Sequence, residues 1–120
     1  KSMISDGCNI GKSTIINSLI GLRTIIGENS HIERTIIMGS DGYEDESEIV
    51  ENQKTNRPNI GLGSNVFIKK AIIDKNARIG KNVRIENKNN YEDYIGSNYI
   101  IKDNIVIIPK GAILEDGTVI

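Results

Sequence analysis

Residues 72–85 read IIDKNARIGKNVRI, with branched aliphatic residues six positions apart at Ile73, Ile79 and Ile85. This spacing matches neither the period of a helix nor the two-residue alternation of a strand. It matches a short strand and a tight turn, in which one aliphatic side chain per unit points inward and Gly, Asn or Asp occupies the turn positions with positive φ. Units of this kind stack into a parallel β-helix. The segment therefore predicts an all-β fold built from hexapeptide repeats.

The same spacing extends over most of the 120 residues. In residues 1–39 it runs, with one step of four that we interpret as an irregular turn, through Ile4, Ile10, Ile16, Ile20, Ile26, Ile32 and Met38. In residues 60–120 it includes Ile60, Val66 and Ile72, and a final coil with Ile101, Ile107, Ile113 and Val119. We expect these side chains to fill the interior of one β-helix domain with about five or six coils.

Two segments interrupt the repeat. Residues 40–59 contain six carboxylates between positions 41 and 51, and Ile49 and Val50 are the only apolar residues in the helix-compatible part of this segment. We expect an acidic excursion that carries a short amphipathic helix and ends at Pro58. The alternative is a solvated acidic loop, because runs of charge usually face water. Residues 87–94 are polar, and we expect them to form a loop at one corner.

The composition excludes several classes of protein. Aromatic residues make up 4% of the chain and there is no Trp, so the core must consist of branched aliphatic side chains. The net charge of −1 argues against a general nucleic-acid binder. No apolar run approaches the roughly 18 residues that a membrane-spanning helix requires. We therefore expect a soluble intracellular domain, cut from a longer protein that carries any targeting signal elsewhere.

Few residues suggest catalysis or metal binding. His31 is the only histidine and Cys8 the only cysteine, so the usual nitrogen and sulfur ligands cannot form a metal cluster or a disulfide. We predict no catalytic residue, no metal site and no cofactor in this chain. One alternative is a hexapeptide-repeat acyltransferase, in which a lone histidine acts as general base and His31 is the candidate. Gly7 to Thr14 lacks the glycine spacing of a phosphate-binding P-loop.

Basic residues are concentrated between positions 69 and 88, where seven stand against two acidic residues. The seven are Lys69, Lys70, Lys75, Arg78, Lys81, Arg84 and Lys88. We expect residues six or eighteen apart to align on the same or equivalent faces outside the β-helix, so that Lys75 with Lys81, or Arg78 with Arg84, would form rows. Such rows can bind a phosphate or carboxylate group, and the alternative is ordinary solubilising charge.

The segments IIMGSDGY, IGLG, IIDKNARIGKNV and ILEDGTVI together resemble the C-terminal domain of the ADP-glucose pyrophosphorylases (glucose-1-phosphate adenylyltransferases) of plants and cyanobacteria. The resemblance implies a left-handed parallel β-helix, whereas the general preference for right-handed crossovers favours the opposite hand. It also implies that the catalytic residues lie in an N-terminal domain absent from this sequence. That domain uses ATP, Mg²⁺ and glucose 1-phosphate to make ADP-glucose for starch or glycogen synthesis.

The resemblance further implies a regulatory and oligomerisation role for this chain. In the family this domain packs against the catalytic domain, contributes to a tetramer and responds to the anionic effectors 3-phosphoglycerate and phosphate. Lys75 in IIDKNAR and Lys110 in PKGAILEDG match two activator-binding lysines of the family. The implied location is the plastid for a plant protein and the cytoplasm otherwise. A purely structural β-helix, which would show no dependence on anions, is the second alternative.

Overall fold

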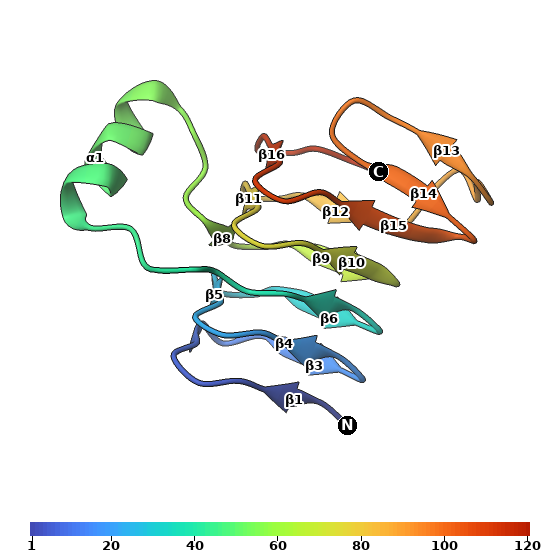
Figure 1. The fold of residues 1–120 in the computed structure, drawn as a ribbon, viewed down its shortest axis with the longest axis horizontal. Helices are drawn as coiled ribbons and strands as arrows, with labels where there is room; N and C mark the ends of the chain where they lie inside the picture. The colour runs from blue at the N-terminus through green and yellow to red at the C-terminus, as the bar shows by residue number, and fades with distance from the viewer.

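A computed structural model describes all residues, 1–120, as stacked coils of short parallel strands from which one helix projects (Figure 1). The strands form three sheets, which we call faces A, B and C. Face A consists of β1 (Met3–Ile4), β4 (Leu19–Ile20), β7 (Ile36–Ile37), β10 (Ala71–Ile73), β15 (Ile105–Ile108), β14 (Ile100–Lys102) and β13 (Tyr94–Ile95). Face B consists of β2 (Asn9–Ile10), β5 (Ile25–Ile26), β8 (Gly61–Leu62), β11 (Arg78–Ile79) and β16 (Ile113–Leu114). Face C consists of β3 (Thr14–Ile16), β6 (His31–Glu33), β9 (Phe67–Lys69) and β12 (Arg84–Ile85).

The interior contains one column of aliphatic side chains behind each face. Successive members of a column are partners in the parallel ladders, and all of those named here are at most 5% exposed. They are Ile20, Ile37, Ile73 and Ile108 on face A, Ile26, Leu62, Ile79 and Leu114 on face B, and Ile32, Ile68 and Ile85 on face C. The predicted inward spacing at Ile73, Ile79 and Ile85 is confirmed, and each of these three residues lies on a different face.

A second inward position lies two residues before most of these aliphatic residues. Its occupants are small or hydroxylated and buried: Ser18, Thr24, Ser30, Thr35, Val66, Ala71, Ala77, Val83 and Val106. The hydroxyls donate to nearby backbone carbonyls, as Thr24 Oγ1 does to Gly21 O at 2.8 Å. Because these hydrogen bonds satisfy the polar atoms, the core tolerates them. Of this set, the sequence analysis identified only Val66.

The predicted register is wrong in several coils, because a coil without an insertion contains 16 or 17 residues rather than 18. Ile20 pairs with Ile37, and the side from Ile32 to Ile37 has five residues, not six. Since a shift of one residue exchanges the two faces of a strand, Met38 is 46% exposed. For the same reason the interior holds Ile15, Ile73, Ile108, Leu114 and Ile120, whereas Ile16, Ile72, Ile107, Ile113 and Val119 face outward.

The helix of the acidic excursion, α1 (Glu46–Thr55), is confirmed, but its predicted apolar anchors are wrong. Asp45 begins the helix with a capping box formed with Glu48, and Asn56 ends it in the left-handed conformation at φ 56°, before Pro58 is reached. Ile49 and Val50 are 38% and 47% exposed. The helix therefore does not attach to the coils through an apolar face, and at ten residues it is too short to cross a membrane.

A second insertion separates the fourth coil from the last. Residues 87–94 form the expected loop, apart from Tyr94, which begins β13. From there β13, β14 and β15 form an antiparallel extension of face A (Figure 1). Ile101 is buried in β14, so its predicted place in the last parallel coil is wrong. The rings of Tyr91, Tyr94 and Tyr99 stack on this extension.

Asparagine dominates the turns, as the repeat pattern predicts. Thirteen non-glycine residues have positive φ, and nine of them are asparagines. These nine are Asn17, Asn29, Asn56, Asn65, Asn76, Asn82, Asn87, Asn90 and Asn104. Asparagine adopts the left-handed region more readily than most residues, so it suits corners where the chain must turn sharply between faces.

Candidate functional site: the corner between faces A and B

Lys75 and Lys110 occupy the same corner of the β-helix, in the turns that follow β10 and β15. The register of these strands aligns Ile73 with Ile108, which places Lys110 one coil beyond Lys75. Gly111 N donates to Lys75 O at 2.9 Å, so the two turns are in direct contact. Both lysines are exposed. The structure thus brings together two cations that are 35 positions apart in the sequence.

Asp41, in the turn after β7, contacts Lys75 from the neighbouring coil. Its Oδ1 lies 3.3 Å from Lys75 Nζ. Asn76 holds Asp41 through two further bonds of 3.0 Å: Asp41 N donates to Asn76 Oδ1, and Asn76 Nδ2 donates to Asp41 Oδ2. The hydrogen bonds from Asn76 and Lys75, the Lys75 charge and then the Lys110 charge lower the pKa of Asp41 below its usual value. The carboxylate is therefore ionised at neutral pH.

Sequence reasoning missed Asp41 and Asn76 as members of this corner. Asp41 counted only as one of the carboxylates of the acidic excursion, and Asn76 only as a turn residue. Asp41 lies 34 positions before Lys75, with the whole excursion in between. No local spacing links the two, because their proximity depends on the stacking of successive coils.

The predicted alignment of residues six apart is wrong. Six residues advance the chain from one face to the next. Lys75 therefore follows a strand of face A, Lys81 follows a strand of face B, and Arg84 lies in a strand of face C. Lys81 follows β11, at the next corner, where its backbone N donates to Asp116 Oδ1 at 2.8 Å. Arg84 lies over the Phe67 ring on face C, 4.2 Å from its centroid. Cations align only when they occupy equivalent positions in successive coils, as Lys75 and Lys110 do.

Arg78 belongs to a buried polar cluster rather than to an exposed cationic row. Its Nη1 donates to Glu44 Oε2 and to Pro58 O, both at 2.9 Å, and its side chain is only 14% exposed. Glu44 also accepts from Ile60 N at 2.7 Å and from Asn52 Nδ2 at 2.6 Å. We call Glu44, Asn52 and Arg78 the polar latch. It joins both ends of the excursion and α1 itself to β11.

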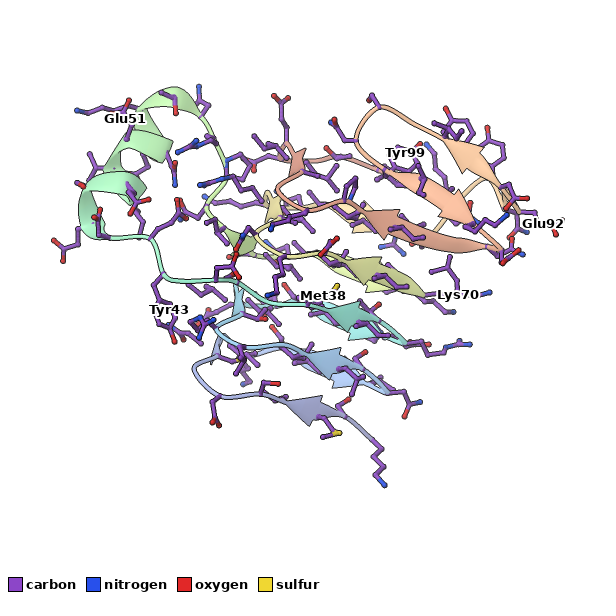
Figure 2. All side chains as sticks on the ribbon, viewed as in Figure 1. Met38, Tyr43, Glu51, Lys70, Glu92 and Tyr99 are labelled. Carbon is purple, nitrogen blue, oxygen red and sulfur yellow. The ribbon has the colours of Figure 1, made fainter.

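The polar latch contradicts the reading of the excursion as a fully solvated loop. The Glu44 side chain is 5% exposed and Asn52 is 1% exposed. Burial acts to raise the pKa of Glu44, but the hydrogen bonds from Asn52, Ile60 and Arg78 outweigh it and the pKa is lowered. Tyr43 adds one more link, since its hydroxyl donates to Gly7 O at 2.6 Å, on the side of the coils from which α1 projects (Figure 2).

His31 lies on face C, away from the corner that holds the lysines. Its ring stacks on Phe67 with the centroids 5.0 Å apart, and its Nε2 lies 3.1 Å from Glu33 Oε1. The contact with His31, followed by that with Arg34, lowers the pKa of Glu33. This packing explains the position of His31 without a catalytic role. No group of three or more His, Cys, Asp or Glu side chains is placed to hold a metal ion.

A groove of 430 Å³ separates α1 from face B. Ile49, Gln53 and Arg57 line it on the side of the excursion, and Ile25 and Lys81 on the side of the coils. The lining mixes aliphatic, amide and oppositely charged groups, so it does not favour any one kind of ligand. The corner with Lys75 and Lys110 is therefore the better candidate site for an anion.

Comparison with known proteins agrees with this architecture. The family model of the GLGC left-handed parallel beta-helix domain matches residues 1–119, which confirms the predicted fold and its hand. The chain is 45% identical, over 121 aligned residues, to the glucose-1-phosphate adenylyltransferase small subunit, chloroplastic/amyloplastic, of Triticum aestivum. The alignment covers 99% of this chain and 26% of the wheat protein, so the chain spans about a quarter of the length of this curated relative.

Proposed function

This chain belongs to the family of GLGC left-handed parallel β-helix domains, and from that membership we propose that it is the regulatory and assembly domain of a glucose-1-phosphate adenylyltransferase. The parent enzyme would make ADP-glucose and pyrophosphate from ATP and glucose 1-phosphate, for starch or glycogen synthesis. ATP and Mg²⁺ would bind in a separate catalytic domain. The observation that carries the proposal is the meeting of Lys75 and Lys110 at one exposed corner.

The chemistry of this corner suits a small anion with more than one negative charge, such as 3-phosphoglycerate or phosphate. Lysine presents a compact charge on a flexible stem, so two lysines on adjacent coils can approach one phosphate group from two sides. Effector binding would favour the arrangement of domains that presents this corner best. It can shift that equilibrium only by the difference in its affinity for the two arrangements.

An apolar ladder on the outside of face A supports the assembly role. One outward aliphatic residue or methionine from each of the seven strands pairs in register with the next. The ladder consists of Met3, Leu19, Ile36, Ile72, Ile107, Ile100 and Ile95, of which Met3 is 69% and Ile95 86% exposed. A continuous apolar surface of this kind marks a contact with another protein surface. We propose that the catalytic domain or a neighbouring subunit of a tetramer covers it.

The wheat relative, whose name places it in the chloroplast or amyloplast, supports a plastid location if this chain comes from a plant. A cytoplasmic location follows if it comes from a bacterium.

The effector site is tested by Lys75→Glu in the full-length enzyme. Because the substitution replaces an attraction with a repulsion, the activator concentration that gives half-maximal activation should rise about tenfold or more. Activity is measured against 3-phosphoglycerate concentration. Lys12→Glu changes the charge equally at an exposed position far from Lys75 in the sequence, and should leave the activation curve unchanged. An unaltered curve for Lys75→Glu would remove Lys75 from the site.

A further inference from the structure

The corner that holds Lys75 and Lys110 already contains an anion, and it belongs to the protein itself. The carboxylate of Asp41 lies 3.3 Å from Lys75 Nζ, within reach of the Lys110 charge. Its second oxygen accepts a 3.0 Å bond from Asn76. The Asp41 carboxylate places a negatively charged oxygen beside Lys75 Nζ, as a phosphate or carboxylate ligand would.

We propose that Asp41 is a tethered counter-ion, which occupies the anion position at this corner and must leave Lys75 before an effector anion binds. The inference rests on the proposed function, because it assigns a regulatory role to the same site. An intramolecular carboxylate competes at a high effective concentration, so it weakens the apparent affinity for a free anion. Asp41 would thereby set the concentration of effector at which the enzyme responds.

The ion pair between Lys75 and Asp41 is exposed and therefore weak. The side chains of Lys75 and Asp41 are 47% and 56% exposed, and exposed ion pairs are weak because water and salt screen them. Asp41 is followed by Gly42, whose missing side chain would have no neighbour within 4 Å. The turn is therefore not packed against other residues at Gly42, directly after Asp41.

The polar latch limits how far such a movement extends. Glu44 lies three residues after Asp41, and its buried bonds to Arg78, Asn52 and Ile60 hold the start of the excursion against β11. Tyr43 is held separately by its bond to Gly7. Release of Asp41 is thus confined to residues 41–42, and α1 stays attached to the coils.

The test is the affinity of the full-length protein for inorganic phosphate, measured by equilibrium dialysis with radiolabelled phosphate. Asp41→Asn removes the charge but keeps an oxygen that can accept from Asn76. The dissociation constant should fall about two- to fivefold, the range expected when an exposed charge contact is lost. Asp41→Ser, which removes the carboxylate by truncation, should act in the same direction. Glu28→Gln, an equal change of charge at an exposed position outside this corner, should have no effect.

Lys75→Glu in the same assay separates the two ideas. If it weakens phosphate binding and Asp41→Asn strengthens it, both the site and the counter-ion are supported. If it weakens binding while Asp41→Asn and Asp41→Ser bind as the unmodified protein does, or more weakly, the site stands and the counter-ion is overturned. If Lys75→Glu itself leaves binding unchanged, the effector site at this corner is wrong, and the inference about Asp41 fails with it.

Discussion

At the scale of single residues, Lys70 occupies a turn position that suits asparagine better. Its φ is 58°, in the left-handed region that asparagine fills at most other corners of this β-helix. Its exposed side chain points away from the coils, on the side opposite α1 (Figure 2). The Lys70 side chain forms no hydrogen bond or ion pair that a substitution would remove.

We expect Lys70→Asn to stabilise the chain by about 0.5–1 kcal/mol, because asparagine reaches the left-handed region at lower cost than lysine. The free energy of unfolding is measured by urea denaturation. Lys88→Asn makes the same chemical change in an exposed loop residue without positive φ, and should have little effect. Equal results for the two variants would show that backbone strain at Lys70 is negligible.

Also at this scale, the sequence motifs located Lys75 and Lys110 but not the groups around them. Each lysine lies in a short segment that resembles a motif of the family, and that resemblance alone singled it out. Asp41 reaches Lys75 only because successive coils stack on one another. The insertion between the two residues contains a helix whose path the sequence does not specify. A residue whose partner depends on such an insertion cannot be identified from spacing alone.

At the scale of elements, the composition was enough to predict the helix, and a local start signal that the prediction did not use was also present, whereas the attachment of the helix was not predictable. Asp45 and Glu48 have the spacing of a capping box, which favours a helix from the next residue onward. The search for apolar anchors then pointed to Ile49 and Val50, yet the buried residue of α1 is Asn52. Three hydrogen bonds make this burial favourable: Asn52 Nδ2 donates to Glu44 and to Asn59, and Arg57 Nε donates to Asn52 Oδ1. Sequence periodicity does not reveal these partners.

The polar latch also predicts how the stability of the excursion responds to acid. The pKa of Glu44 is lower in the folded chain than in the unfolded one, so the latch contributes its full stability above the unfolded pKa, about 4.3 for a glutamate. As the pH falls below that value, the unfolded chain binds a proton first and folding is disfavoured. The contribution disappears once the pH has fallen through the folded pKa.

We expect Glu44→Gln to destabilise the chain by about 1–3 kcal/mol at pH 7, because Arg78 loses its charged partner in a largely buried position. The difference from the unmodified chain should shrink between pH 5 and pH 3, where the glutamate itself becomes neutral. Urea denaturation across this range measures it. Glu28→Gln, an exposed counterpart, should show no such convergence, and a constant difference for Glu44→Gln would contradict the proposed linkage.

At the scale of the whole molecule, the number of coils and the parallel stacking followed from the aliphatic spacing, but the contents of the outer surface did not. The spacing treats each repeat as six residues, and each side that has only five residues moves the inward set by one position. Residues such as Ile36, Ile72 and Ile107 then stand on the outside of face A, where they form the apolar ladder. A sequence rich in isoleucine conceals this surface, because inner and outer positions carry the same residue type.

The ladder makes a prediction about assembly. Ile36 lies near its middle and is 43% exposed, so Ile36→Asp places a charge in the surface that we propose is covered in the parent enzyme. The substitution removes about 1.5–3 kcal/mol of apolar burial and adds the cost of burying a charge. The dissociation constant of the assembly should therefore rise at least about tenfold, as measured by analytical ultracentrifugation of the full-length protein. Val50→Asp, at a position on α1 with 47% exposure, is the matched control and should leave assembly intact. If both variants assemble as the unmodified enzyme does and melt at the same temperature, face A is open to solvent, and another surface must hold the domains and subunits together.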